Sequence, residues 1–227
     1  MTSARPALVT VTEMFEAVLW DFGGVILSSP FEAFNHYEEA HGLPRDFIRS
    51  VNATKPHTNA WARLERTEIT PEEFDEAFHE DSFALGHGVR GGNVLALLAG
   101  EVRPEMVRAL DRVRDAGYKT ACLTNNVVNR IIEGAEGADP RAVEIATIME
   151  RFDAIVESSK VGVRKPEPRF YEIACELLDV QPSACVFLDD LGINLKPAAA
   201  MGMRTIKVTS ADQAITELEN VLGISLG

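Results

Sequence analysis

Short apolar runs alternate with helical patterns along most of this 227-residue chain, and this alternation restricts the fold more than any other feature. We expect strands at residues 17–20, 119–123, 153–156, 184–188 and 204–208. Helical patterns lie before the second strand, at residues 104–116, and on either side of the fourth, at residues 168–178 and 195–201. Strands spaced by helices predict an α/β fold: a Rossmann-like, doubly wound parallel sheet with helices on both faces.

The segment between the first strand and residue 104 has a different pattern, because its helices are not separated by strands. Helical patterns occur at residues 31–41, 46–51, 70–83 and 93–98. The third begins at Thr70-Pro71-Glu72-Glu73, which combines an N-cap residue, a proline in the first turn and a glutamate three residues after the cap. We therefore predict a core domain at 1–27 and 104–227, with a helical cap domain inserted at 28–103.

Charge and cysteine content restrict the partners and the compartment. The net charge of −13 argues against nucleic acid and acidic membranes as partners, because binding a polyanion needs a basic surface. No apolar run reaches the length of a membrane span, and residues 1–13 lack the apolar centre of a secretion signal. Cys122, Cys175 and Cys185 lie in apolar patterns and are expected to be reduced core thiols, which favours a cytoplasmic protein. Either Met1 or Met14 is a possible start.

Polar residues follow the predicted strands where ligands bind in a parallel sheet, outside the carboxyl ends of the strands. Asp21 ends the first strand and is followed by Gly23 and Gly24. The pair Thr124-Asn125 ends the second, Lys165 follows the third, and Asp189-Asp190 ends the fourth. A single strand-end aspartate is usually a turn or cap residue. Four separate segments that converge at one edge predict a functional site.

These stretches resemble the haloacid dehalogenase superfamily, subfamily IA. The resemblance is carried by Trp20-Asp21-Phe22-Gly23-Gly24-Val25, by Leu123-Thr124-Asn125, and by residues 157–168 and 186–197. Within the superfamily the chain is similar to the phosphatase-type N-terminal domains of soluble epoxide hydrolases and to their single-domain bacterial relatives. The resemblance implies a hydrolase with a nucleophilic aspartate, acting on a small phosphorylated metabolite. The sequence leaves both a monomer and a homodimer open.

For the metal, the resemblance implies Mg²⁺ held by the Asp21 carboxylate, the Gly23 carbonyl and Asp190, with Asp189 beside them. A hard cation prefers oxygen ligands and offsets the repulsion between a carboxylate and a phosphate. Asp21 would attack phosphorus and form an aspartyl-phosphate that water then hydrolyses.

For the phosphoryl group, the resemblance implies binding by Thr124 and the Asn125 backbone. Lys165 would neutralise charge on the transferred group and orient Asp21. Asn194 would support the same loop and the waters of the metal.

Gly23 departs from the family pattern, because many relatives have an aspartate there that protonates the leaving group. Loss of a general acid typically costs about 10²–10⁴-fold in rate. Three outcomes are open: substrates with easier leaving groups such as sugar 1-phosphates or acyl phosphates, a proton from His36, His57 or water, or loss of turnover. Some phosphatases of the superfamily are similar in having glycine at this position.

Two other functions compete with a phosphatase. The first is a non-catalytic phosphate- or metabolite-binding domain, which the glycine at position 23 favours. The second is a metal-free 2-haloacid dehalogenase, which Asp189-Asp190 argues against because such an enzyme needs no Mg²⁺. A dinucleotide-type pattern of glycines at 86–91 follows a helical stretch rather than a strand, so we do not interpret it as a cofactor site.

Overall fold

The computed structural model describes residues 15–98, 100–126 and 140–227, and within them a five-stranded parallel sheet forms the centre. The strand order is β3-β2-β1-β4-β5. The strands are β1 (Ala17–Trp20), β2 (Lys119–Thr124), β3 (Ala154–Glu157), β4 (Cys185–Asp189) and β5 (Arg204–Lys207). The order reverses between β1 and β4, and open sheets of this kind bind their ligands at the carboxyl ends of the strands beside such a reversal.

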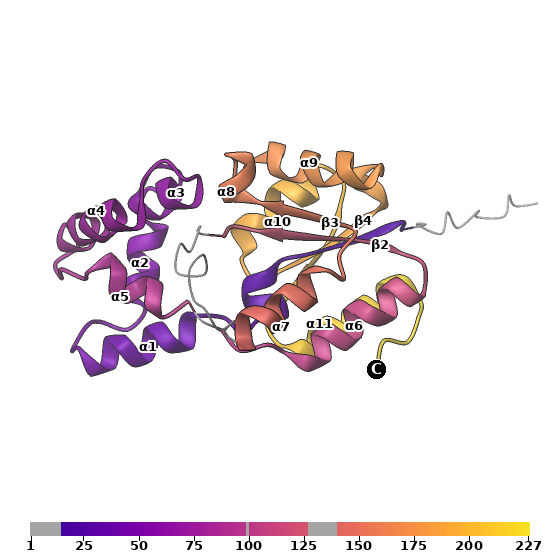
Figure 1. Cartoon of the computed structure of the whole chain (residues 1–227), viewed down its shortest axis with the longest axis horizontal. Coiled ribbons are helices and arrows are strands. Elements are labelled where there is room, and N and C mark those ends of the chain that lie inside the picture. The colour runs from indigo at the N-terminus through magenta and orange to yellow at the C-terminus, as the bar shows by residue number, and fades with distance from the viewer. Residues whose placement is uncertain (1–14, 99, 127–139) are drawn as a thin grey trace, which may run out of the picture.

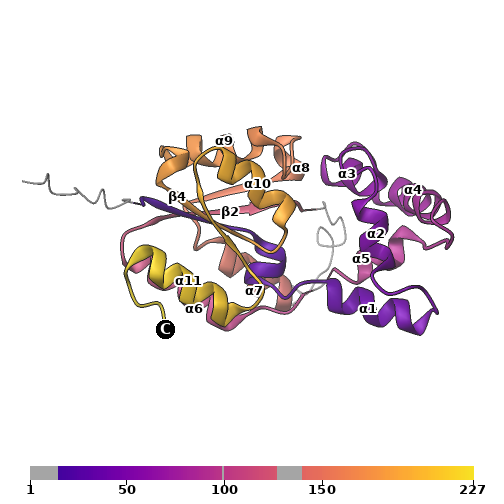
Figure 2. The ribbon, with the colours of Figure 1, turned by 180° about the vertical axis from the view of Figure 1, so that it is seen from behind.

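Helices cover both faces of this sheet (Figures 1 and 2). The core helices are α6 (Pro104–Asp115), α7 (Pro140–Met149), α8 (Ser158–Val161), α9 (Pro168–Leu178), α10 (Gly192–Ala200) and α11 (Ala211–Leu222), with a 3₁₀ turn, η3 (Pro182–Ala184), before β4. Val18 and Trp20 pack with α6 and α11, whereas Ala17 and Leu19 pack with α9 and α10. Successive strand residues point to opposite faces, so a strand that is apolar throughout requires cover on both sides. The predicted doubly wound α/β fold is confirmed.

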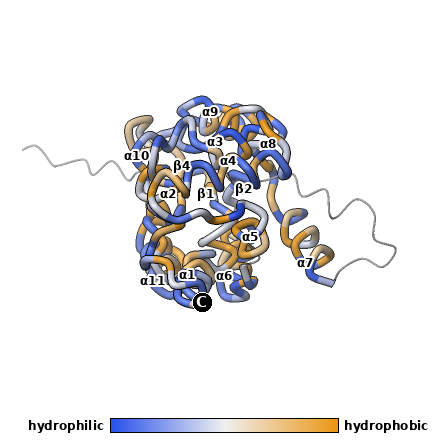
Figure 3. The backbone as a smooth tube through the Cα atoms, turned by 90° about the vertical axis from the view of Figure 1, so that its left-hand side faces the viewer, coloured by the Kyte–Doolittle hydropathy of each residue, from blue (hydrophilic) through white to orange (hydrophobic). Residues whose placement is uncertain are grey.

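Helix α7 differs from the other core helices in how much of it lies against the sheet. It stands to one side of the core in Figure 3. Ile148, near its C-terminal end, is buried in the cluster formed with α6 and α11. Val143, near its N-terminal end, is 51% exposed.

Residues 31–96 form five helices with an apolar cluster of their own, seen on the left of Figure 1. These are α1 (Phe31–Ala40), α2 (Phe47–Ala53), α3 (Ala60–Glu65), α4 (Pro71–Phe83) and α5 (Gly91–Ala96). Helix α4 begins as its sequence predicts: Thr70 accepts from the Glu73 backbone N–H while the Glu73 side chain accepts from the Thr70 N–H. We call this group the cap.

The cap joins the core through two segments that run side by side. Leu27 and Val102 form an isolated antiparallel bridge. The Ser28 N–H donates to the Glu101 carbonyl at 2.7 Å, and the Arg103 N–H donates to the Ile26 carbonyl at 2.9 Å. These bonds tie the two connections together where they leave the core.

The structure adds helices that the sequence patterns did not predict. Helices α3, α7, α8 and α11 are absent from the expectations above, and the expected helix at 93–98 begins earlier and runs from Gly91 to Ala96. The glycine pattern at 86–91 follows helix α4, as its sequence context indicates. No helix among the described residues is both long enough and apolar enough to cross a lipid bilayer.

Candidate active site

Three adjacent strands deliver polar side chains to the same edge of the sheet. Asp21 follows β1, and its N–H donates to the Leu188 carbonyl of β4 at 2.9 Å. Thr124 is the last residue of β2, and Asp189 is the last residue of β4. All three side chains are largely buried, with Asp189 fully so. The predicted convergence of strand-end residues is therefore present in the fold.

Lys165 reaches this edge from the loop before α9 and joins two of the carboxylates. Its Nζ lies 2.8 Å from Asp21 Oδ1 and 2.8 Å from Asp189 Oδ2, and the side chain is 1% exposed. Burial raises the pKa of Asp21 well above its usual value, against the opposing effect of the Lys165 ammonium. Burial would lower the pKa of Lys165, but Asp189 and Asp21 outweigh it and raise that pKa. Lys165 thus stays a cation between two buried acids.

Asp189 is already surrounded by hydrogen-bond donors. Its Oδ1 accepts from the Leu191 N–H at 2.7 Å, and the Asn194 amide donates to both of its oxygens at 3.0 and 3.1 Å. The Tyr171 hydroxyl donates to the Asn194 carbonyl at 2.7 Å, which fixes the start of α10. The structure therefore places Asn194 beside Asp189, where it orients that carboxylate.

Asp190 completes a group of three carboxylates. One oxygen from each of Asp21, Asp189 and Asp190 lies within 4.8 Å of the others. Burial, followed by the charge of Asp189, raises the pKa of Asp190 to about 6. Ser29, which the sequence patterns did not single out, donates to Asp190 Oδ2 at 3.3 Å. Carboxylates this close repel one another, and Lys165 is paired with Asp21 and Asp189 but not with Asp190. The donor set therefore fits a hard divalent metal ion beside Asp190 and Asp21.

The turn after Asp21 brings the backbone close to Asp190. It forms a short helical turn, η1 (Phe22–Ile26), whose first N–H donates to Asp21 Oδ1 at 2.7 Å. Gly24 has φ +78°, and a Cβ there would collide with the Asp190 carboxylate. Gly23 has φ −70° and ψ 132°, and beyond its two chain neighbours no atom lies within 4 Å of where its Cβ would be. The backbone geometry therefore requires glycine at position 24 but not at position 23.

We expect Gly24→Ala to destabilise the protein, since it combines a left-handed backbone with a steric clash. A non-glycine residue in this conformation costs about 1–2 kcal/mol before the clash is counted. For a chain of this size that corresponds to a fall in Tm of roughly 2–8 °C, measured by thermal unfolding. Gly23→Ala is the matched control and should leave Tm unchanged. Equal losses in both variants would contradict the assignment of the clash to Gly24.

Asn125 acts on the main chain of the Lys165 loop. Its Oδ1 accepts from the Lys165 N–H at 2.9 Å, and its Nδ2 donates to the Lys165 carbonyl at 3.0 Å. The neighbouring Asn126 donates to Glu157 at 2.7 Å and accepts from the Ser159 hydroxyl at 2.8 Å. Asn126 was not singled out from the sequence, although it directly follows Asn125. The end of β2 thus fixes both the strand end of β3 and the lysine loop.

The cap contacts the core beside this loop. Arg164 Nε lies 2.5 Å from Glu65 Oε2 of α3, and Arg164 Nη1 donates to the Pro56 carbonyl at 2.9 Å. The other Glu65 oxygen accepts from Trp61 Nε1 at 2.9 Å. Burial raises the pKa of Glu65 to about 7, although Arg164, Trp61 and Lys165 all act to lower it.

The raised pKa of Glu65 predicts a pH-dependent term in stability. The folded state holds this proton more tightly than the unfolded chain, so the contribution is complete below about pH 4.5 and is lost as pH rises through about 7. The free energy of unfolding of wild type should fall relative to that of Glu65→Gln by on the order of 3 kcal/mol when the pH is raised from 5 to 8.5. Urea unfolding at both pH values measures this difference. Parallel pH dependence in the two proteins would contradict it.

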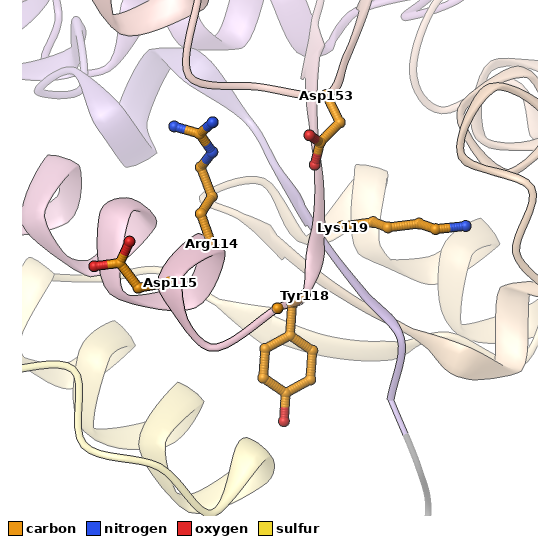
Figure 4. A pocket seen from close by; sticks show the side chains of 6 residues that line it. Arg114, Asp115, Tyr118, Lys119 and Asp153 are labelled. Carbon is orange, nitrogen blue, oxygen red and sulfur yellow. The ribbon is translucent and has the colours of Figure 1, made fainter.

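A hollow at the opposite end of the strands is a weaker candidate for an active site. It is lined by Arg114, Asp115, Gly117, Tyr118, Lys119 and Asp153 (Figure 4). Lys119 Nζ donates to the Leu178 carbonyl at 2.6 Å, and Asp153 accepts from the Thr120 N–H and hydroxyl. These charged groups are engaged within the fold, so the carboxyl-end site remains the candidate.

Comparisons with known proteins identify the family of the chain. The model of the haloacid dehalogenase-like hydrolase family matches residues 15–202. The chain is 34% identical over 217 residues to acyl-CoA dehydrogenase family member 10 of Mus musculus, and 33% identical over 215 residues to bifunctional epoxide hydrolase 2 of the same species. These matches cover 93% and 90% of this chain but 20% and 38% of the two relatives, so the chain spans well under half the length of either.

A solved structure shares the fold. It is a HAD family enzyme from Bacteroides thetaiotaomicron, in complex with magnesium and inorganic phosphate, with a TM-score of 0.57 and 21% sequence identity. The match covers 90% of this chain and 98% of that one. At this identity the likeness concerns the fold.

Proposed function

The chain belongs to the haloacid dehalogenase-like hydrolase family, and on that premise we propose that it is a Mg²⁺-dependent phosphatase of a small phosphorylated metabolite. One observation carries the proposal: the Lys165 ammonium is held between Asp21 and Asp189, with Asp190 in the same carboxylate group. A buried cation beside two carboxylates, with a third carboxylate oxygen within 4.8 Å, suits a metal ion and an anionic substrate. The Bacteroides enzyme that shares the fold is described with magnesium and phosphate, which agrees with this choice.

Asp21 is the proposed nucleophile. Among the described residues, the hydrogen bonds and ion pairs to its carboxylate fall on Oδ1, from Phe22 and Lys165. Oδ2 is therefore the oxygen available to attack phosphorus. The attack expels the leaving group and forms an aspartyl-phosphate, which a water molecule then hydrolyses to regenerate the carboxylate. Lys165 would orient Asp21 and neutralise charge on the transferred group.

Asp21, Asp190 and the Gly23 carbonyl are the groups that would hold Mg²⁺. Asp189 lies close by, but its oxygens are occupied by Leu191, Asn194 and Lys165, so its proposed part is to support the site. When bound, Mg²⁺ supplies charge stabilisation to the phosphoryl oxygens. Thr124 and the Asn125 backbone N–H would bind those oxygens from the β2 side.

The glycine at position 23 affects which leaving groups can be expelled rapidly. With no side chain at this position, no carboxylic acid from it can protonate a departing alkoxide. We therefore favour substrates whose leaving group departs as a stable anion, such as acyl phosphates or sugar 1-phosphates.

The proposal is tested by assaying a panel of acyl, aryl, sugar 1- and alkyl phosphates with Mg²⁺ and with EDTA. We expect turnover that requires Mg²⁺ and favours the better leaving groups, and Asp190→Asn should raise the Mg²⁺ concentration needed for half-maximal rate. Halide release from 2-haloacids in EDTA would instead indicate a dehalogenase. Binding of phosphate and beryllofluoride without turnover of any substrate would indicate a non-catalytic domain.

A further inference from the structure

The contacts between cap and core concentrate on the loop that carries Lys165. Arg164 reaches into the cap and contacts both Glu65 and the Pro56 carbonyl. Arg66 of the cap lies 3.4 Å from Glu167, and the Thr67 hydroxyl donates to the Ser159 carbonyl at 3.3 Å. Figure 1 shows the same arrangement at the level of the elements, with α3 next to α8. The cap therefore rests on the segment between β3 and α9.

Arg164 and Glu65 are the most buried charges of this interface. Their side chains are 12% and 6% exposed, whereas Glu167 is 36% exposed. Burying an ion pair removes hydration from both groups, so such a pair is a poor source of stability compared with apolar packing. Its placement, however, is restrictive: Arg164 Nε lies 2.5 Å from Glu65 of a cap helix as an ion pair without hydrogen-bond geometry, and Arg164 Nη1 donates to the Pro56 carbonyl of the preceding loop. Few relative positions of cap and core satisfy both contacts.

Lys165 is the next residue, and its position is determined from three directions. Asn125 binds its backbone N–H and carbonyl. Asp21 and Asp189 bind its ammonium. The third restraint is the covalent link to Arg164, whose side chain is fixed by the cap. A displacement of Arg164 would therefore be transmitted directly to the lysine main chain.

We propose that Glu65 and Arg164 are positioning residues for Lys165, so that docking of the cap holds the lysine ammonium in place beside Asp21. This inference rests on the proposed function, in which Lys165 acts on the phosphoryl group. Docking of the cap thereby contributes to the chemical step. An undocked cap leaves Arg164 without both of its cap partners and releases one of the three restraints on Lys165.

Steady-state kinetics with p-nitrophenyl phosphate and Mg²⁺ test this role. At pH 8.5, above the pKa of about 7 of Glu65, Glu65→Gln removes the negative charge while keeping the size of the side chain. Under these conditions Glu65→Gln and Arg164→Met should each lower kcat by about 10- to 100-fold, because sub-ångström to ångström displacement of a catalytic group has effects of this size. The double variant should be no slower than the slower single, within about 2-fold, since both changes remove one interaction. KM should change much less than kcat.

Glu167→Gln is the matched control. It removes a cap–core ion pair two residues from Lys165 without touching Arg164, so kcat should stay near wild type. Hydrogen exchange of peptides covering residues 158–167 should accelerate in Glu65→Gln and Arg164→Met only. If Arg164→Met does not fold, Arg164→Lys, which keeps the charge and loses the two-nitrogen contact, replaces it with the same expected direction.

The outcomes separate the inference from the function on which it rests. A wild-type protein that turns over substrate, with the variants at wild-type kcat or with losses that simply multiply in the double variant, overturns the positioning role alone. Equal losses in Glu167→Gln also overturn it, because the interface as a whole would then be responsible. A wild-type protein without turnover overturns the phosphatase proposal, and the positioning role with it.

Discussion

Asp21→Asn is expected to abolish phosphatase turnover while leaving the protein folded. Removing a nucleophile lowers kcat by on the order of 10⁴- to 10⁶-fold. The neutral amide cannot form the aspartyl-phosphate, although it keeps the shape of the side chain. Lys165 retains its ion pair with Asp189, and an amide oxygen can still accept from the Phe22 N–H. Burial already disfavours the Asp21 charge, so we expect Tm to stay the same or rise.

The measurement is single-turnover kinetics with acid quench and mass spectrometry of the protein. Wild type should carry one phosphoryl group that maps to Asp21, and the variant should carry none. Asp115→Asn changes an exposed carboxylate at the opposite end of the strands and serves as the control. A variant at position 21 that retains a tenth or more of wild-type kcat would show that the nucleophile lies elsewhere.

The sheet could be predicted from sequence because its strands are apolar on both faces. Residues 17–20 are all fully buried, and such a run has few alternatives in a chain with helices on either side. The missed helices are of two kinds. Helix α3 is only six residues long, and its N-cap residue is Asn59, whose side chain accepts from the Ala62 N–H. Helix α11, by contrast, begins with a capping box of Ser210 and Gln213, a start signal that the sequence does contain.

The candidate site could be predicted as a set of residues but not as a set of contacts. Parallel strands bring their carboxyl ends together, so Asp21, Thr124 and Asp189 must meet once the strand order is fixed. Which donor satisfies which acceptor depends on loop conformation, and the side chain of Asn125 binding the Lys165 main chain has no sequence signature. The same is true of Ser29 at Asp190.

Contacts between cap and core were the least predictable part. The pair Glu65–Arg164 joins residues from different lobes, and periodicity within either segment carries no information about the partner. Each residue alone resembles an ordinary surface charge, because Glu65 ends a short helix and Arg164 lies in a loop. Only the docked position of the cap reveals that both are buried.

Gly23→Asp is expected to increase turnover of substrates with poor leaving groups. The backbone at residue 23 has φ −70° and ψ 132°, which any residue adopts, and the space around its Cβ is open. An aspartate there would lie two residues from Asp21, with space for a carboxylic acid that protonates a departing alkoxide. General acid catalysis typically contributes about 10²–10⁴-fold, so kcat for a primary alkyl phosphate should rise by about 10²-fold or more.

The leaving group provides the internal control for this variant. An acyl phosphate or p-nitrophenyl phosphate departs without a proton, so its kcat should change by less than about 3-fold. Gly23→Ala adds a side chain without an acid and should leave the alkyl rate at the wild-type level. As the pKa of the leaving group rises, kcat should therefore fall steeply for wild type and Gly23→Ala. It should fall only weakly for Gly23→Asp. If wild type already shows the weak dependence, a group other than residue 23 donates the proton, and the preference for stable leaving groups is wrong.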